Sequence, residues 1–310
     1  MKIGLIHRPS TVWPKFDWVA EGLGCEGHEV HHGATMDQLE LLDRECDVLL
    51  FEHREPGPGR KRIVQYAPHR QATWLSWWFD LFLGNPHVDH LQLFGPLNRC
   101  MDAVFVKERG MLDAYKAEGI SAHWLDQGCP LGWKACEHRE SPEFDVLIFG
   151  SRMGEYRQRH RDVQSLADAG FKVAWAGDNG GVPSKVESLS WCQTVELPQL
   201  MSRAAVTLHV DLRSDVPGYR SDRFWLATGA GACVLSRKSL ETPDVPHVTY
   251  ERFDEETIGR IRSLVGDRKQ RQEIGKAARD AVMAEHTYRN RVREIVQFVE
   301  GCRSTAGQAV

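Results

Sequence analysis

Short apolar runs with the character of β-strands alternate with helix-like segments along most of the chain, and this alternation restricts the fold more than any other feature. Residues 47–51 read Asp-Val-Leu-Leu-Phe and residues 144–149 read Phe-Asp-Val-Leu-Ile-Phe. Nearly continuous apolar runs of this kind are typical of strands buried on both faces of a parallel sheet. Strands that alternate with helices predict parallel sheets covered by helices on both faces, so we expect an α/β fold.

The alternation occurs twice, and a polar segment that contains a proline, residues 136–144, separates the two occurrences. We therefore predict two Rossmann-like domains, residues 1–136 and residues 144–310. The second domain is expected to close with three helical segments, at residues 257–265, 268–285 and 290–300. Ligands of such sheets bind beyond the carboxyl ends of the strands, so the expected site is the cleft between the two domains.

The composition is that of an ordinary globular protein, with 42% hydrophobic and 26% charged residues. No apolar run approaches the roughly 20 residues needed to span a bilayer. Residues 1–7 are expected to form a strand and not a signal peptide, because they lack a long apolar stretch. The eight cysteines show no C-x-x-C spacing. We therefore expect reduced, mostly buried thiols in a cytoplasmic protein.

Two short motifs match known signatures but stand in the wrong structural context. Residues 22–27 match G-x-G-x-x-G, yet they close the predicted helix 16–26 and do not directly follow the first strand. We interpret them as a helix end and not as a dinucleotide fingerprint. Residues 28–32 match H-E-x-x-H, but in a strand residues four apart are about 13 Å apart, too far for one zinc ion to bind both histidines.

The segment from residue 221 to residue 235 has the character of an anion site. It reads Ser-Asp-Arg-Phe-Trp-Leu-Ala-Thr-Gly-Ala-Gly-Ala-Cys-Val-Leu. The order of small polar residues, a cation and an apolar helical stretch predicts that Asp222 and Arg223 lie near a helix N-terminus. The free N–H groups there favour anions, and the forked arginine donor fits a phosphate. The segment therefore predicts one half of a diphosphate site.

A second turn of this kind directly follows the predicted strand 144–149. Gly150, Ser151 and Arg152 connect this strand to a helix predicted over residues 155–169. Backbone N–H groups in a strand-to-helix turn point at whatever lies above the sheet, so the turn is a candidate phosphate contact. The helix itself is very basic, and most of its cations are expected to face solvent.

Taken in order, these segments resemble the donor-binding domain of GT-B fold glycosyltransferases. They are most similar to the CgeB-like group (spore maturation protein CgeB-type, with a glycosyltransferase group 1-like C-terminal domain). That group has the pattern S-D-R-x-F-E-x-x-x-x-G-A, which resembles residues 221–232, and a closing H-T-Y-x-x-R, which resembles residues 286–291. In the first half, residues 77–80 resemble its W-x-x-D segment and residues 125–128 its L-P-x-G turn. The resemblance covers most of the chain.

The resemblance implies a GT-B architecture of two facing Rossmann-like domains with C-terminal helices, and glycosyl transfer without a bound metal. The acceptor would bind mainly the N-terminal domain and the nucleotide-sugar donor the C-terminal domain. Without a metal, Arg152, Arg223 and helix N-termini would stabilise the leaving diphosphate. Gly177, Glu196 and Leu197 would line the nucleoside end of the donor site. No cofactor is implied, since the nucleotide sugar is a co-substrate.

The chain departs from the family pattern at the position that usually holds the ribose. Where the family has a glutamate three residues after the arginine, this chain has Leu226. The acidic position eight residues earlier is Gly218. Asp222 or Asp215 are candidates to take over the ribose contact, and an unusual donor is the alternative.

An inverting transfer needs a base on the acceptor side to take the hydroxyl proton, whereas a retaining transfer does not. Asp80 is the first candidate, because it follows an aromatic segment in which partial burial can raise the pKa of a carboxyl. Asp17, after the first strand, is the second candidate and His7 the third. The aromatic residues before Asp80 are interpreted as core, with a sugar-stacking platform as the alternative. They are Trp74, Trp77, Trp78 and Phe79.

We therefore predict a metal-independent glycosyltransferase that moves a sugar from a nucleotide-diphosphate sugar to a hydroxyl of a glycan, a protein, a small molecule or a hydroxylated DNA base. Residues 1–144 carry 15 basic and 21 acidic side chains, which makes DNA the less favoured acceptor. DNA stays among the candidate acceptors because of a local basic patch, which comprises Arg60, Lys61, Arg62 and Arg70. The alternatives are a catalytically degenerate nucleotide-binding or sugar-binding relative and another Rossmann-type enzyme that uses NAD.

Overall fold

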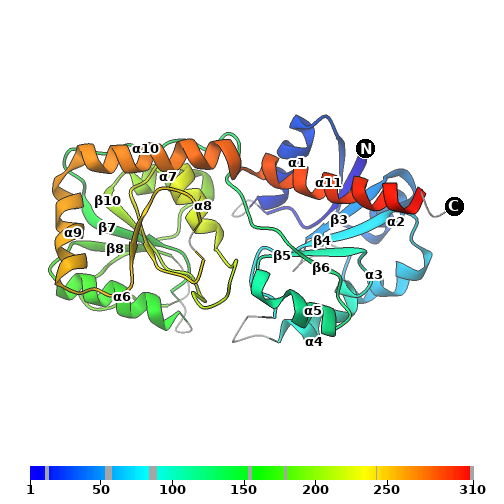
Figure 1. The fold of residues 1–310 in the computed structure, drawn as a ribbon, viewed down its shortest axis with the longest axis horizontal. Coiled ribbons are helices and arrows are strands. Elements are labelled where there is room, and N and C mark those ends of the chain that lie inside the picture. Colours follow the sequence, from blue (N-terminus) through cyan, green and yellow to red (C-terminus); the bar gives the residue numbers. More distant parts are fainter. Residues whose placement is uncertain are drawn as a thin grey trace. The chain divides into compact units, whose positions relative to one another are not determined.

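The computed structural model divides the chain into two compact units (Figure 1). The first comprises Met1–Leu131, Val216–Tyr219 and Thr287–Val310, and the second comprises Gly132–Asp215 and Arg220–His286. The residues that the structure describes are 1–10, 14–52, 58–83, 89–152, 156–177, 180–241 and 243–307. None of the helices in this part of the chain has the length and apolar character that crossing a membrane requires.

The first unit is built on a six-stranded sheet with the strand order β2-β1-β3-β4-β5-β6, in which all neighbouring strands are parallel. Its strands are β1 (Lys2–Ile6), β2 (Glu29–Gly33), β3 (Val48–Glu52), β4 (Thr73–Trp77), β5 (Ala103–Val106) and β6 (Ala122–Trp124). Its helices are α1 (Lys15–Cys25), α2 (Met36–Glu45), α3 (Arg60–Tyr66), α4 (His90–Asn98), α5 (Leu112–Ala117) and α11 (Tyr288–Gly307), with 3-10 turns η1 (Ala67–His69) and η2 (Arg109–Met111).

The second unit is built on another six-stranded parallel sheet, with the order β12-β11-β10-β7-β8-β9. Its strands are β7 (Phe144–Phe149), β8 (Val173–Ala176), β9 (Glu187–Leu189), β10 (Ala204–His209), β11 (Val234–Arg237) and β12 (Val248–Tyr250). Its helices are α6 (Arg157–Asp168), α7 (Leu197–Met201), α8 (Asp222–Gly229), α9 (Glu255–Gly266) and α10 (Arg268–Glu285), with a 3-10 turn η3 (Thr194–Glu196). The predicted α/β class with parallel sheets is therefore confirmed.

Each sheet reverses its strand order once, and this point fixes where a ligand can bind. In the first sheet the chain moves from β1 to β2 on one side and continues with β3 on the other side of β1. In the second sheet β8 and β9 lie on one side of β7, and β10 lies on the other. Ligands of open parallel sheets bind at the carboxyl ends of the strands that flank such a reversal. The residues that follow β1, β7 and β10 are therefore the first to consider.

The aromatic segment around β4 is core. Trp74, Trp77 and Trp78 are fully buried and Phe79 is 1% exposed. The interpretation as core is confirmed, and the alternative of a sugar-stacking platform is wrong, because these rings have no exposed face. Asp43, in α2, accepts a hydrogen bond from Trp74 Nε1 at 2.7 Å, which satisfies the buried indole.

Helix α11 packs on the first unit, whereas the sequence grouped its residues with the second domain. Its apolar side chains recur at helical spacing and lie beside Ile3, Leu23 and Leu50 of the first unit. These side chains are Val292, Ile295, Val296 and Val299. An apolar stripe at this spacing must be buried against some core, and its spacing alone does not say which one.

The G-x-G-x-x-G segment has a structural role in this packing. A Cβ at Gly22 would lie 3.2 Å from Arg289 Cα, so this glycine lets α11 come close to α1. Gly27 has a φ of +78° just after the helix, where a residue without a side chain is strongly favoured. The interpretation as a helix end is therefore confirmed.

Candidate active site

The carboxyl ends of β7 and β8 meet where two predicted glycines lie. Gly150, directly after β7, has a φ of +119°, and a Cβ there would lie 2.6 Å from Arg223 Nη1. A Cβ at Gly177, directly after β8, would lie 2.2 Å from the Gly150 carbonyl oxygen. The Gly177 contact is with backbone and leaves no room for a side chain, whereas a side chain at Gly150 would displace the Arg223 guanidinium, so both glycines allow this approach. The structure thus brings together Gly150, Gly177 and Arg223, which the sequence grouped as donor-binding residues.

Arg223 lies in the first turn of α8, as predicted. Its guanidinium is half-buried and has no hydrogen bond or ion pair with any residue that the structure describes. Its neighbour Asp222 accepts a hydrogen bond from the Arg223 backbone N–H at 2.9 Å and so engages one N–H at the helix N-terminus. A guanidinium that is partly desolvated and uncompensated at a helix N-terminus favours an anion.

A buried polar network that the sequence did not predict holds this helix end. Asp211 accepts hydrogen bonds from Arg220 Nη1 at 2.9 Å and from the Ser221 backbone N–H at 2.8 Å. His209 Nε2 lies 3.2 Å from the Asp211 carboxylate and 3.0 Å from Ser221 Oγ. Arg220 also donates to Ser239 Oγ at 2.7 Å. The network ties the end of β10 to the start of α8.

The charges of this network are balanced within it. Burial opposes the ionisation of Asp211, but His209, the Arg220 guanidinium and the Ser221 N–H outweigh it and hold the pKa of Asp211 well below its usual range. Burial lowers the pKa of His209, although Asp211 opposes this shift. The Asp211 carboxylate is therefore paired with Arg220 at neutral pH, and the charge of the neighbouring Arg223 is left for a ligand.

Arg152 makes contacts different from those expected. Only 7% of it is exposed, and its guanidinium donates to Ser188 Oγ at 2.8 Å and to the Trp175 carbonyl at 2.6 Å, and also to the Leu189 carbonyl. These bonds hold it against the ends of β8 and β9. Its direct contact with a diphosphate, and that of the half-exposed Ser151, stay predictions.

The arginines of α6 are solvent-exposed except for one. Arg157 and Arg161 are exposed as expected, but Arg159 is only 2% exposed. Its Nε donates to the Val210 carbonyl at 2.9 Å and its Nη1 to the Ser151 carbonyl at 3.4 Å. Arg159 therefore connects the turn after β7 to the end of β10. The first residue of the predicted helix, Glu155, lies outside the described residues.

The residues predicted for the nucleoside end contribute in different ways. Glu196 is exposed, and its carboxylate accepts a hydrogen bond from the Gln193 backbone N–H at 2.9 Å. Leu197 is fully buried at the start of α7. Leu226, which stands where the family has a glutamate, is also fully buried, so its side chain belongs to the core. A nucleoside contact by Gly177, Glu196 or Leu197 stays a prediction.

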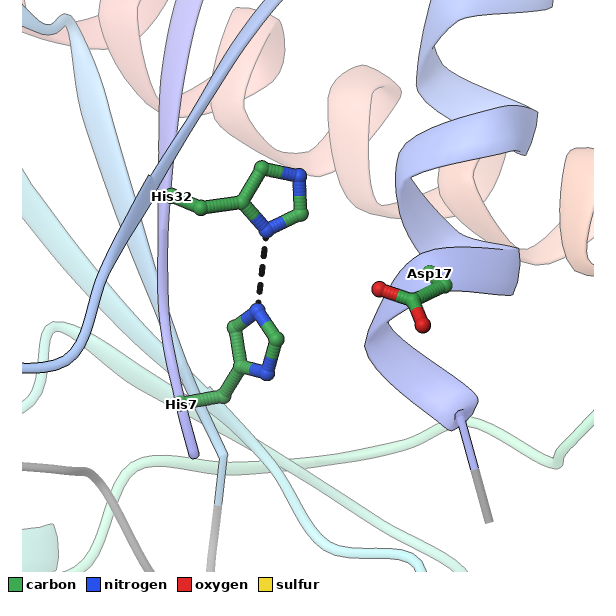
Figure 2. Close-up of side chains that lie close together, drawn as sticks. All are labelled: His7, Asp17 and His32. Carbon is green, nitrogen blue, oxygen red and sulfur yellow. Dashed lines mark hydrogen bonds between the residues drawn. The ribbon is translucent and has the colours of Figure 1, made fainter. Parts of the chain in front are cut away.

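Three titratable side chains gather at the carboxyl end of β1 in the first unit (Figure 2). They are His7, Asp17 and His32, whose ligand atoms all lie within 4.8 Å of one another. His7 Nε2 and His32 Nδ1 are 2.9 Å apart. Burial lowers the pKa of His7, so its imidazole is mostly neutral at neutral pH. The sequence named His7 and Asp17 as candidate bases, but it did not predict that His32 joins them.

Asp80, the first candidate base, follows β4 and is half-buried. The ring of its neighbour Phe79 lies 5.9 Å from the ring of Phe16, edge to face. This contact places the chain after β4 next to the first turn of α1, which carries Asp17. Asp80 does not belong to the His7 cluster, and its role as a base stays a prediction.

Several solved structures match the fold over nearly the whole chain at low sequence identity. HepE from Anabaena, in complex with UDP and glucose, has a TM-score of 0.65 at 14% identity, covering 96% of this chain and 99% of its own. An alpha-glucosyltransferase in complex with UDP and a DNA containing an HMU base has a TM-score of 0.69 at 11% identity, covering 97% and 99%. Phage T4 BGT in complex with UDP-glucose has a TM-score of 0.64 at 13% identity, covering 99% of both chains. These similarities show the fold, which is the predicted GT-B type.

No curated protein matches the chain at a significant level. A protein-family model described as glycosyl transferase-like matches residues 134–297, more than half of the chain. The matched region contains Gly150, Gly177 and Arg223. The match supports the predicted glycosyltransferase at the level of this broad family. It does not show membership of the narrower CgeB-like group. The chain belongs to the glycosyl transferase-like family.

Proposed function

We propose that this protein transfers a sugar from a nucleotide-diphosphate sugar to a hydroxyl acceptor, with the donor diphosphate bound at Gly150 and Arg223. The observation that carries the proposal is the Arg223 guanidinium, which lies against Gly150 at the reversal point of the second sheet and has no partner among the described residues. We assign the donor to the second unit and the acceptor mainly to the first. The residue patterns at 221–232 and 286–291 support a narrower assignment to the CgeB-like group.

The leaving group of the reaction is a nucleoside diphosphate, which gains negative charge as the bond to the sugar breaks. Arg223 and the N–H groups of the turn after β7 and of α8 would stabilise this charge directly, and electrostatic stabilisation of this kind usually contributes most to catalysis. Arg152 and Arg159 would act by holding the strand ends in place, since their guanidinium groups bind backbone carbonyls. The network of Asp211 and Arg220 would fix the direction of α8.

UDP is the nucleotide we favour. HepE was solved with UDP and glucose, and phage T4 BGT with UDP-glucose. T4 BGT was also solved with UDP and Mn²⁺. We propose that transfer by this protein does not require a metal, because the guanidinium and amide donors can balance the diphosphate charge. The assay must therefore compare reactions with a chelator and with Mn²⁺.

The acceptor hydroxyl would lose its proton to Asp80, or to Asp17 if Asp80 is only structural. Two of the similar structures act on or bind DNA according to their descriptions, an alpha-glucosyltransferase with DNA and a DNA-modifying beta-glucosyltransferase. The basic residues Arg60, Lys61 and Arg62 at the start of α3 would suit a DNA backbone. The net acidity of residues 1–144 favours a glycan, a protein or a small molecule. We place the protein in the cytoplasm because its cysteines are free thiols among the described residues.

The test is release of UDP from a panel of UDP-sugars by the purified protein, with and without acceptors. We expect UDP release in the presence of a chelator, increased by the right acceptor. Asp80→Asn should lower the rate with acceptor by at least about 100-fold if the transfer inverts configuration, and Asp17→Asn should lower it less. Hydroxymethylated DNA and unmodified DNA serve as a matched acceptor pair.

A catalytically degenerate binding protein is the second candidate. It is favoured by Leu226, which is buried where the family has a carboxylate. Under this alternative the protein binds UDP, and Arg223→Gln weakens that binding, but no UDP-sugar is hydrolysed or transferred under any condition.

A further inference from the structure

The cluster at the carboxyl end of β1 has the composition of a metal site, although the H-E-x-x-H match at residues 28–32 contributes only His32 to it. We propose that His7, Asp17 and His32 bind one divalent transition-metal ion of the Zn²⁺ and Co²⁺ class. The site lies within the first unit, is distinct from the donor site, and goes beyond the proposed function. Figure 2 shows the two imidazoles facing each other with the carboxylate beside them.

Three neighbouring elements bring these residues together. Strands β1 and β2 are parallel neighbours in which Leu5 pairs with His32, and the His7 backbone N–H donates to the Gly33 carbonyl at 3.0 Å. Helix α1 returns to the same end of the sheet, with Asp17 in its first turn. Phe16 packs against His7, with 5.1 Å between the ring centroids. The position of all three ligands therefore follows from the packing of β1, β2 and α1.

The hydrogen bonds of His7 prepare one of its nitrogens for a metal. His7 Nδ1 lies 3.2 Å from the Arg8 carbonyl oxygen, which can only accept, so we assign the ring proton to Nδ1. The lone pair of Nε2 then points at His32 Nδ1, 2.9 Å away. A histidine that donates one N–H to a backbone carbonyl and offers the other nitrogen is the usual arrangement of a metal ligand. An ion would replace the proton that the two imidazoles share.

The distances require only a small adjustment. Zinc binds imidazole nitrogen at about 2.0–2.1 Å, so two neighbouring ligands of a tetrahedral ion are about 3.4 Å apart. The imidazole nitrogens are slightly closer than this, at 2.9 Å, and the whole set lies within 4.8 Å. The Asp17 carboxylate is solvent-exposed, so its side chain can move by about 1 Å to complete the site.

The exposure of the cluster decides what kind of site it is. His7 is 6% exposed, whereas Asp17 and His32 are exposed, so an ion can enter from solvent and keep water in its open positions. Two imidazoles and one carboxylate suit Zn²⁺, Co²⁺ or Ni²⁺ better than Mg²⁺ or Ca²⁺, which prefer oxygen ligands. A bound ion would also occupy Asp17 and leave Asp80 as the acceptor-side base.

The experiment is a titration of the full, tag-free chain with Co²⁺, followed by its visible absorption, and with Zn²⁺, followed by calorimetry, without nucleotide. We expect one ion per chain. His32→Gln and Asp17→Asn should each weaken binding at least about tenfold, because each removes one of three ligands. The matched control is His31→Gln on the same strand. His31 pairs with Glu29 at 2.9 Å and faces the opposite side of the sheet, so this variant should bind as the wild type does.

Failure of the wild-type chain to bind either ion would overturn the proposal. So would equal binding by His32→Gln and His31→Gln in folded protein, since the ion would then lie elsewhere. Two ligand variants at exposed positions keep the test informative if one of them folds poorly. Because no nucleotide is present, these outcomes are independent of UDP binding at Arg223, so failure here leaves the proposed transferase intact.

Discussion

Replacement of Gly150 by alanine tests whether the turn after β7 positions Arg223 for the donor. The new methyl group would lie 2.6 Å from Arg223 Nη1 and 2.9 Å from its Cδ, whereas ordinary contacts begin near 3.4 Å. The flexible arginine must therefore move aside by about 1 Å in the least disruptive response. Losing one charge-assisted hydrogen bond to the diphosphate costs about 1.5–3 kcal/mol. We thus expect UDP to bind about 10-fold to 150-fold more weakly.

The alanine also has to adopt the positive φ of +119° at this position, which costs roughly 1–3 kcal/mol of stability. Gly170→Ala separates this strain from the displacement of Arg223. Gly170 lies in the same unit with a φ of +88°, and a Cβ there would have no neighbour within 4 Å. We expect Gly170→Ala to lower the melting temperature but to leave the dissociation constant for UDP unchanged.

The assay is calorimetric titration of UDP into both variants and the wild type, with circular dichroism to confirm folding. If folded Gly150→Ala binds UDP as tightly as the wild type, the turn does not position the diphosphate-binding arginine. If both variants lose affinity equally, the effect comes from general destabilisation and the reasoning from the close contact is wrong.

Three further predictions concern stability. Arg220→Ala should lower the free energy of unfolding, measured with urea, by about 3–5 kcal/mol, because it leaves the buried Asp211 carboxylate unpaired. Arg213→Ala removes one partner of an exposed ion pair and should lower it by less than about 1 kcal/mol. Thr35→Ala should lower the free energy of unfolding by about 1 kcal/mol, because it removes the side-chain cap of α2, and its dissociation constant for UDP should equal that of the wild type. The folded chain binds a proton at His209 less readily than the unfolded chain does, because burial lowers the pKa of this histidine. The free energy of unfolding should therefore fall as the pH drops below about 6.5, by up to about 1.4 kcal/mol per pH unit for this group. Unfolding of His209→Gln should depend less on pH, and an unchanged slope would contradict the assignment.

The fold could be predicted largely because its strands are buried on both faces. Continuous apolar runs located β3 and β7 within a residue of their observed bounds. Strand β4 was not predicted, because Trp74 and Trp77 stand three residues apart, a spacing that also fits a helix, and further aromatic residues follow them. The place of α11 was not predictable either, since its apolar stripe fits any uncovered sheet and only the close approach at Gly22 selects the first unit.

The candidate site was predictable where backbone geometry demands a particular residue. Gly150 and Arg223 stood out because a turn at a strand end and a helix N-terminus have recognisable residues, whereas Gly177 was named only through the family resemblance. The partners of this site were missed because they are polar residues that become buried only through tertiary contacts. Asp211 lies two residues after β10, and its place just beyond an apolar run was the available signal for its position at the end of the sheet. The meeting of His32 with His7 depends on the register of β1 and β2, which a single sequence does not show.

The central claim is that Arg223 binds the diphosphate of the donor. The most direct measurement is the dissociation constant of UDP for the wild type, for Arg223→Gln and for Arg161→Gln, with a chelator present. Arg161 is an exposed arginine of α6 in the same unit. Arg161→Gln is the matched control, because it removes the same charge as Arg223→Gln. We predict that Arg223→Gln weakens binding at least about tenfold and that Arg161→Gln leaves it nearly unchanged. Equal affinities of all three proteins, or loss of UDP binding by the wild type when the metal is chelated, would contradict the account.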